Sequence, residues 1–258
     1  MKLDFFKMHA QGNDYIYFDF LNKEIPDIDF SELSKKLSNR HFAIGADGIV
    51  LISNDKDCDA YMRIFNIDGS EAEMCGSALR CTGYYLNKHN WLQTDSVNTK
   101  SGIKRINIPE DDIIEVSLGN ATMITEKPVN ITGFNGNLVD IGNPHFVCFT
   151  DVLNPQITSR FGPLIENDEY FPNKINIEFV QILSRDEISI EIWERGSGRT
   201  LACGTGAGAS AFACCMKGLT QRKVKVNMPG GSVFAEIKDS EILLSGEVSF
   251  VFEGTILL

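Results

Sequence analysis

The sequence has little of several features that would point to a membrane or a nucleic acid. No apolar run approaches the roughly 20 residues of a membrane span, and the N-terminal segment MKLDFFKMHA lacks the apolar core of a signal peptide. The whole sequence contains 24 Lys and Arg against 35 Asp and Glu, which gives a formal net charge of −11. This charge disfavours nucleic acid and anionic membranes as partners. We therefore expect a cytoplasmic protein that binds neither of them.

Patterns typical of metal sites, disulfide scaffolds and nucleotide sites are also missing. The seven cysteines are odd in number and include no Cys-x-x-Cys, and the four histidines form no His-x-x-x-His. The glycine-rich stretch GTGAGAS (204–210) lacks the Lys-Ser/Thr of a P-loop. We therefore expect reduced cysteines, no metal ion and no nucleotide cofactor.

What the sequence does contain is a pair of matching triplets, Cys75-Gly76-Ser77 and Cys203-Gly204-Thr205. Each stands where a predicted strand gives way to a predicted helix. The start of a helix favours a thiolate over a thiol because of its positive end and its unpaired N–H groups. Those same N–H groups, from Gly76, Ser77, Gly204 and Thr205, are suited to holding a carboxylate.

The triplets belong to an internal repeat with a period of about half the chain. Asn13 and Asn143 are 130 positions apart, and Cys75 and Cys203 are 128 apart. Asn66 precedes Cys75 by nine positions, as Glu194 precedes Cys203. A repeat of this kind predicts two duplicated domains related by a pseudo-twofold axis, with both cysteines facing a shared cleft.

Periodicity and turn residues predict an α+β fold. We expect domain boundaries at 1–118 for the half that carries Cys75 and 119–247 for the half that carries Cys203, with 248–258 crossing back to the first. The expected strands are 3–9, 15–20, 48–53, 60–65, several between 96 and 118, 142–151, 176–183, 188–193 and several beyond 223, and the expected helices are 30–39, capped by Asp29 or Ser31, 78–86, 154–166 and one after Cys203.

Two cysteines that meet one substrate atom from opposite sides suggest inversion at a carbon α to a carboxylate. Removing that hydrogen without a cofactor requires positioned donors at the carboxylate and a base that is already ionised. One sulfur would remove the proton and the other would deliver a proton to the opposite face. One must then be thiolate while the other is thiol, so activity should be bell-shaped in pH.

Five spaced motifs cover essentially the whole chain: GNDY, FNIDGSEAEMCG, GNPHFV, NIEFVQ and ERGSGRTLACGTGAGAS. In this order they resemble the diaminopimelate epimerase family. The resemblance implies two pseudo-symmetric domains, each a curved antiparallel sheet wrapped around a central helix. It also implies cofactor-independent interconversion of LL- and meso-diaminopimelate, on the route to lysine and peptidoglycan.

The resemblance also implies residue roles. Cys75 and Cys203 would be the two acid/base groups, Glu194 would meet the reacting ammonium, and His145 would support the site. The residues that would orient the substrate, chiefly its distant amino-acid end, are Asn13, Asn66, Asn143, Asn176 and Arg195.

Three positions depart from the family pattern. Ser77 stands where the family usually has Asn, Arg199 where members commonly have Glu, and Gly48 where some members have Gln. Backbone N–H donation survives the change at Ser77. The other two departures bear on the identity of the substrate more than on the type of reaction.

Other interpretations stay open at this point. A racemase of the same fold could act on proline, hydroxyproline or histidine, which would need less charge and hydrogen bonding in the cleft than a distal carboxylate does. A binding protein could close around an amino acid without any turnover. Either cysteine alone would more often be a core residue. The sequence also leaves open whether the chain forms a homodimer.

Overall fold

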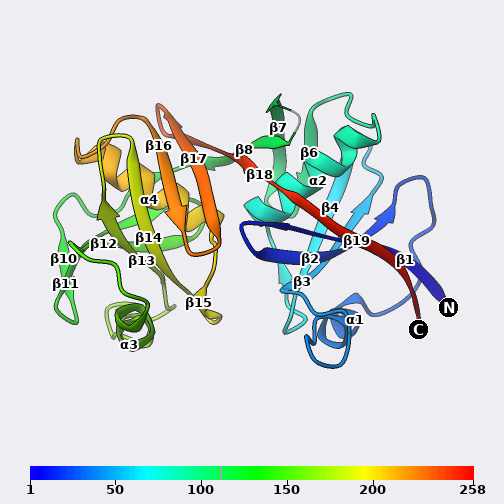
Figure 1. Cartoon of the computed structure of the whole chain (residues 1–258), viewed down its shortest axis with the longest axis horizontal. Helices are drawn as coiled ribbons and strands as arrows, with labels where there is room; N and C mark the ends of the chain where they lie inside the picture. Colours follow the sequence, from blue (N-terminus) through cyan, green and yellow to red (C-terminus); the bar gives the residue numbers. More distant parts are fainter. Residues whose placement is uncertain (111) are drawn as a thin grey trace. The chain divides into compact units, whose positions relative to one another are not determined.

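The computed structural model describes residues 1–110 and 112–258, which form two compact units. Unit 1 comprises Met1–Val116 and Gly246–Leu258, and unit 2 comprises Ser117–Ser245. The chain passes from one unit to the other along strand β8 (Ile113–Asn120) and returns along strand β18 (Glu241–Glu247) (Figure 1).

Unit 1 is built from strands and two helices. Its last strand, β19, comes from the C-terminal end of the chain and pairs with β1, the first strand. Apart from β8, its elements are β1 (Lys2–Ala10), β2 (Asn13–Phe20), α1 (Phe30–Leu37), β3 (Gly48–Ser53), β4 (Ala60–Asn66), β5 (Glu71–Ala72), α2 (Gly76–Lys88), β6 (Ser96–Thr99), β7 (Gly102–Glu110) and β19 (Ser249–Leu257).

Unit 2 has the same plan with one additional short strand, β10. Apart from β18, its elements are β9 (Thr122–Met123), β10 (Val129–Ile131), β11 (Phe134–Asp140), β12 (Pro144–Phe149), α3 (Pro155–Glu166), β13 (Asn176–Ile182), β14 (Glu187–Glu194), β15 (Gly198–Thr200), α4 (Gly204–Met216), β16 (Lys223–Met228) and β17 (Gly231–Lys238).

The strand pairings repeat between the units, element by element. In unit 1, β19 pairs with β1, β1 with β2, β2 with β3, β3 with β4 and β4 with β6. In unit 2 the same directions recur for β9 with β11, β11 with β12, β12 with β13, β13 with β14 and β14 with β16. The α+β fold with two pseudo-symmetric halves is thereby confirmed.

The sheets differ from the expected antiparallel arrangement in one respect. The pairings of β2 with β3, β4 with β6, β12 with β13 and β14 with β16 are parallel. Each of these pairs is joined by one of the helices α1 to α4. Parallel neighbours require such a crossover connection, whereas a short turn can only join antiparallel strands. The sheets are therefore mixed.

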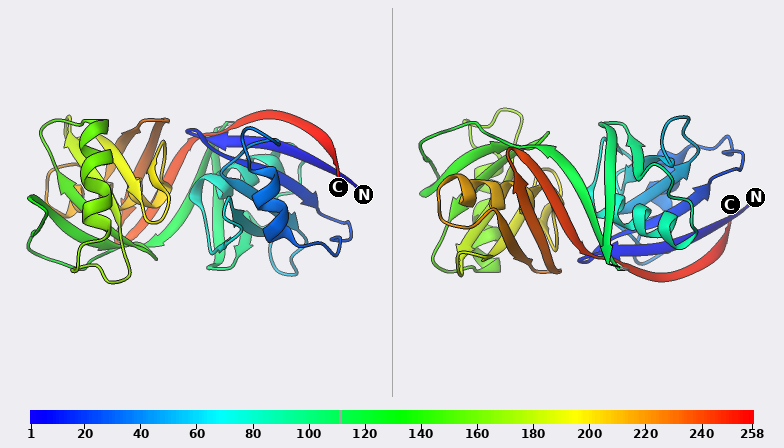
Figure 2. Two further views of the ribbon diagram at one scale, coloured as in Figure 1. Left: turned by 90° about the horizontal axis from the view of Figure 1, so that it is seen from below. Right: turned by 90° about the horizontal axis from the view of Figure 1, so that it is seen from above.

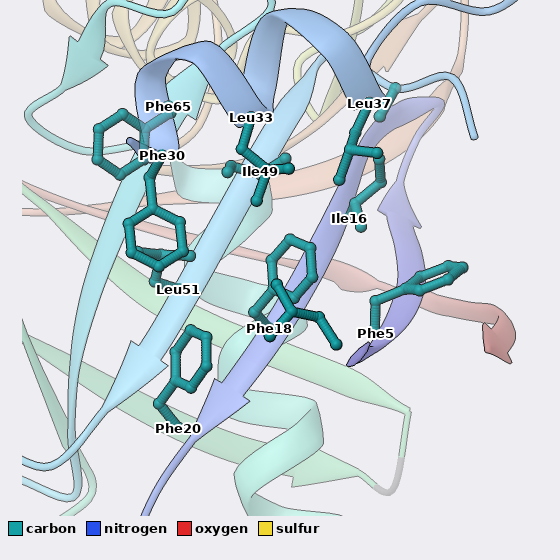
Figure 3. Packing of buried hydrophobic residues seen from close by; sticks show 12 residues of the cluster. Phe5, Ile16, Phe18, Phe20, Phe30, Leu33, Leu37, Ile49, Leu51 and Phe65 are labelled. Atoms are coloured by element: carbon teal, nitrogen blue, oxygen red, sulfur yellow. The ribbon is translucent and has the colours of Figure 1, made fainter. Parts of the chain in front are cut away.

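Helix α1 forms where its apolar residues recur at helical spacing. Asp29 caps it by accepting hydrogen bonds from the backbone N–H groups of Ser31 and Glu32. Its buried face points toward side chains of β1 to β4 (Figure 3). The packed cluster includes Phe30, Leu33 and Leu37 from the helix and Phe5, Ile16, Phe18, Phe20, Ile49, Leu51 and Phe65 around it.

Helix α3 occupies the matching place in unit 2. Asn154 caps it and Pro155 opens it, a position where the missing N–H of proline costs nothing. Gly162 lets the helix approach Trp193 of β14, because a Cβ at this position would collide with the indole ring. Seen from below, α1 and α3 each lie over the strands of their own unit (Figure 2, left).

Helices α2 and α4 are the central elements of the two units. Every residue of α4 from Gly206 to Cys214 is buried, and strands β11 to β14, β16 and β17 pack around the helix. Its Ala and Gly residues let these strands approach closely; a Cβ at Gly208 would lie 3.0 Å from Leu118 and Ile141. A helix that is apolar all round is suited to such an enclosed position.

Among the described residues, none of the helices has the length and apolar character needed to cross a membrane.

The buried thiols in the central helices predict a pH-dependent stability. Burial raises the pKa of Cys81 in α2 and of Cys214 in α4 to about 12, against roughly 8.5 for an unfolded chain. The folded state therefore holds protons that the unfolded state releases, and the contribution to stability is present below pH ~8.5 and lost up to pH ~12. We expect urea unfolding free energies to fall by roughly 1 kcal/mol per pH unit per thiol in this range.

Variants test the origin of this slope. Cys81→Ala and Cys214→Ala should each show a shallower dependence of the unfolding free energy on pH than the parent chain. Equal slopes in all three proteins would contradict the assignment.

Candidate active site

In unit 1, Cys75 is the N-cap residue of α2, with an extended backbone that leads directly into the helix. Its side chain is half-buried. The Sγ atom donates to Asn13 Oδ1 at 3.3 Å and receives a hydrogen bond from the hydroxyl of Tyr15 at 3.7 Å. Asn13 opens β2, and its side chain lies against Cys75.

An ionic cluster holds Asn13 in place. Its Nδ2 donates to Asp47 Oδ2 at 2.8 Å, and Arg40 binds both Asp47 and Asp14, at 2.8 and 2.6 Å. Burial would raise the pKa of Asp14, but hydrogen bonds from Arg40 and Lys7 hold that pKa below its ordinary value. The asparagine amide is thus oriented with its oxygen toward the sulfur.

Asn66 ends β4, and its Nδ2 donates to the Ser70 hydroxyl at 3.0 Å within the following turn. In the sheet, Gly48 lies between Tyr15 and Asn66. A Cβ at Gly48 would collide with the backbone carbonyl of Phe65. The glycine at this departure from the family pattern is therefore required by the neighbouring strand.

The first residues of α2, Gly76 and Ser77, are buried beside the cysteine. The first N–H groups of a helix have no partner within it. Further along the same helix, the buried Arg80 donates to Gln11 Oε1 at 2.7 Å and to the backbone carbonyl of Glu247 at 3.5 Å. This buried cation lies in the helix that Cys75 caps, and the sequence pattern did not single it out.

In unit 2, Cys203 is the N-cap residue of α4 and is only 7% exposed. Its Sγ accepts from the backbone N–H of Gly206 at 3.3 Å and lies 3.4 Å from Thr205 Oγ1. Thr205 in turn accepts from Asn143 Nδ2 at 3.4 Å. Three predicted residues, Cys203, Thr205 and Asn143, are thereby brought together, and Gly204 begins the helix between them.

Glu194, at the end of β14, is hydrogen-bonded to Cys203. The Thr200 hydroxyl from β15 donates to Glu194 Oε1 at 2.5 Å. Burial raises the pKa of Glu194, which these two hydrogen bonds partly oppose. Glu194 thus lies beside Cys203, and Thr200 is a contact that the sequence did not reveal.

The ionisation of Cys203 differs from the sequence expectation. Burial raises the pKa of its thiol well above the ordinary value, and the carboxylates of Glu194 and Glu178 raise it further. Hydrogen bonds from Thr205 and Gly206 act in the opposite direction without reversing the shift. The position at a helix start therefore does not make Cys203 a thiolate here, and it is a thiol at neutral pH.

Asn176 and Arg195 are hydrogen-bonded to each other, and the partners in these hydrogen bonds do not include Cys203. The Asn176 amide bridges the carbonyl of Pro144 and the backbone N–H of Arg195, each at 3.0 Å. The Arg195 side chain is exposed and reaches the carbonyl of Asn173 at 3.4 Å. Asn176 thus fixes the backbone that presents the arginine.

His145, on β12, is fully buried and contacts Asn143 Oδ1 at 3.1 Å through Nε2. Its Nδ1 lies 2.7 Å from Glu178 Oε1 on β13. Sequence reasoning missed Glu178, although it lies within the motif NIEFVQ as a charged residue between the apolar Ile177 and Phe179. Arg199, another departure, binds Glu191 at 2.7 and 3.1 Å.

The chain is similar to known proteins over nearly its whole length. The diaminopimelate epimerase family model matches residues 5–124 and 137–251. The diaminopimelate epimerase of Halothermothrix orenii is 40% identical and covers 100% of this chain and 99% of its own. A Bacillus anthracis phenazine biosynthesis protein of the PhzF family has a TM-score of 0.75 at 15% identity, with both chains fully covered. A probable proline racemase from Agrobacterium radiobacter K84 gives 0.72 at 14%, covering 99% and 93%.

The duplicated fold, with a cysteine at the start of each central helix, belongs to the amino-acid epimerases, a class of isomerases. Within that class, the chain belongs to the diaminopimelate epimerase family.

The charges around Cys203 predict how its reactivity depends on pH. In Glu194→Gln the carboxylate that raises the Cys203 pKa is gone, so the thiolate should form at lower pH. Site-resolved mass spectrometry of iodoacetamide labelling between pH 7 and 10 should show Cys203 reacting at lower pH than in the parent chain.

Glu187→Gln is the matched control, because Glu187 binds Lys225 and Asn227 at the other end of the same strand. It should leave the labelling profile of Cys203 unchanged. A profile that stays in place or moves to higher pH in Glu194→Gln would refute the assigned electrostatics.

Proposed function

We propose that this chain interconverts LL- and meso-diaminopimelate without a cofactor, by transferring protons at the α carbon through Cys75 and Cys203. The observation that carries the proposal is the recurrence of a cysteine N-cap at the central helix of both units. Membership of the family and relatives such as that of Halothermothrix orenii support the choice of substrate. The product feeds lysine and peptidoglycan synthesis.

The reaction needs a base on one face of the carbon and an acid on the other. A thiolate takes the α proton, the electron pair stays on the carbon beside the carboxylate, and the second thiol gives its proton to the opposite face. In each direction, the cysteine that is ionised takes the proton from its own face, and the cysteine that is a thiol delivers one to the other face. The reverse reaction exchanges the two roles.

The charge that develops beside the carboxylate must be met by donors that are already in place. We assign this role to the N–H groups at the two helix starts, from Gly76 and Ser77 in unit 1 and from Gly204 and Thr205 in unit 2. Helix N-termini are suited to anions because their N–H groups and dipole point the same way.

The remaining assignments concern binding of the substrate. Glu194, hydrogen-bonded to Cys203, would meet the ammonium group of the reacting carbon. His145 would support the site through Asn143. The distal amino-acid end would be bound by polar side chains at or next to strand ends, namely Asn13, Asn66, Asn143, Asn176 and Arg195.

We assign one catalytic cysteine to each domain, residues 1–118 with 248–258 for Cys75 and residues 119–247 for Cys203. We further propose that the enzyme is cytoplasmic, acts on a small molecule and forms a homodimer. Sedimentation equilibrium should then give twice the chain mass of 28.7 kDa, and a monomer at micromolar concentration would contradict the last proposal.

Loss of either thiol should stop epimerisation. Cys75→Ala and Cys203→Ala should each lower kcat by at least about 100-fold, because general acid–base catalysis contributes roughly 10² to 10⁴ per group. Circular dichroism and thermal unfolding should show that both variants remain folded.

Cys58→Ala is the control, since Cys58 lies in the loop between β3 and β4 and caps no helix, and it should keep the parent rate. Retained epimerisation in either of the other two variants would contradict the two-thiol scheme.

Substrate identity is tested by comparing amino acids in heavy water. LL-diaminopimelate should gain deuterium at the α carbon and convert to the meso form, whereas proline, hydroxyproline and histidine should not. The fold shared with a probable proline racemase is the observation that favours this second candidate. Turnover of proline without turnover of diaminopimelate would establish a racemase, and exchange in none of them would indicate a binding protein.

A further inference from the structure

Glu178 is a fully buried carboxylate that the mechanism above does not use. It lies on β13, beside β12, which carries His145, and both side chains are 0% exposed. Oε1 of Glu178 lies 2.7 Å from Nδ1 of His145. The other oxygen, Oε2, is buried with no hydrogen-bond partner among the described residues. Burying a carboxylate costs free energy unless it is paired or hydrogen-bonded, and the contact with His145 is therefore the interaction that offsets this cost.

The hydrogen bonds of His145 determine where its protons lie. Asn143 donates through Nδ2 to Thr205, so its oxygen faces His145 Nε2 at 3.1 Å. An amide oxygen can only accept, so Nε2 carries a proton. The short contact on the other side of the ring holds a further proton between Nδ1 and Glu178. The carboxylate thus fixes the ring with its Nε2–H toward Asn143.

This order is transmitted to the sulfur of Cys203. Because Thr205 Oγ1 accepts from Asn143 at 3.4 Å, its own proton is directed to Cys203 Sγ, also at 3.4 Å. The thiol proton of Cys203 is engaged by Glu194. A reversed Asn143 amide would present a donor to His145 and an acceptor to Thr205, which would turn the hydroxyl proton away from the sulfur.

Glu178 also packs against the turn of α4 that holds the cysteine. A Cβ at Gly206 would lie 2.5 Å from Glu178 Oε1 and 3.3 Å from Cys203 Cβ. The N–H of Gly206 is one of the two donors to Cys203 Sγ. The carboxylate therefore lies against the backbone that sets the position of the sulfur.

Unit 1 has no such carboxylate at the matching position. Tyr15 is paired with Gly48 as His145 is paired with Asn176, so Val50 corresponds to Glu178. There the Tyr15 hydroxyl donates to Cys75 directly. Of these two corresponding positions, the one in the Cys203 half therefore carries a buried carboxylate and the one in the Cys75 half does not.

We propose that Glu178 is a positioning residue for Cys203, acting through His145, Asn143 and Thr205 to keep a hydroxyl donor on the sulfur. The proposal rests on the proposed epimerase function for its kinetic consequences only. Its structural content, a His145 ring protonated at Nε2 because of Glu178, is independent of any substrate.

Two substitutions separate this role from simple packing. Glu178→Leu fills the space but leaves Nδ1 without a partner, and should lower kcat about 100-fold with KM nearly unchanged. Glu178→Gln can still donate an N–H to Nδ1, and should keep kcat within about 10-fold of the parent. Glu187→Gln, at the far end of β14 from Cys203, is the matched control and should change neither parameter.

The spectroscopic readout is ¹⁵N NMR of histidine-labelled protein, with His145 assigned by its loss in His145→Gln. In the parent chain and in Glu178→Gln, Nε2 should be protonated; in Glu178→Leu, the tautomers should be mixed. This measurement on the parent chain stands even if Glu178→Leu does not fold.

An unprotonated Nε2 in the parent chain, or a folded Glu178→Leu with the parent kcat, would overturn the proposal. If the parent chain fails to epimerise diaminopimelate, the proposed function falls while the NMR result still decides the role of Glu178.

Discussion

The constraint on which the structure depends is that each central helix is enclosed by its own sheet and begins at a cysteine. A helix wrapped in strands offers little beyond its end to a ligand, and that end is where the first N–H groups have no partner within the helix. The side chains that reach each cysteine therefore come from strand ends and helix starts, such as Asn13 in unit 1 and Glu194 in unit 2. The Ala and Gly residues of α4 allow the strands to enclose the helix, and this enclosure leaves the cysteine at its start as the part that a ligand can reach.

The two halves share a topology but surround their cysteines with different charges. The helix of Cys75 carries the buried cation Arg80, whereas Cys203 lies near the carboxylates of Glu194 and Glu178. Duplication supplies two similar positions, and the buried charges then make them unlike. A reaction that needs one sulfur to accept a proton while the other donates benefits from this difference. The asymmetry follows from single residues: Val50 in unit 1 stands at the position that corresponds to Glu178 in unit 2.

Local patterns in the sequence predicted much of this structure, and tertiary packing determined the rest. Capping by Asp29, helical spacing in α1 and the repeat of Cys75 and Cys203 are short-range signals, and each is present in the structure. Alternation of apolar residues cannot tell parallel from antiparallel neighbours, so the four parallel pairings were missed. The raised pKa of Cys203 depends chiefly on burial, which cannot be read from the position of a cysteine at a helix start. The role of Glu178 depends on its contact with His145 on the adjacent strand, and the sequence alone does not show this contact.

The central claim is that two different sulfur atoms carry protons on opposite faces of one carbon. The most direct test is the progress curve of LL-diaminopimelate in heavy water, followed by circular dichroism. The account predicts a transient overshoot past the equilibrium ratio, because the first product carries deuterium and returns more slowly than the protiated substrate reacts. A curve that reaches equilibrium without overshoot, with product retaining the proton of the substrate, would show that one group serves both faces.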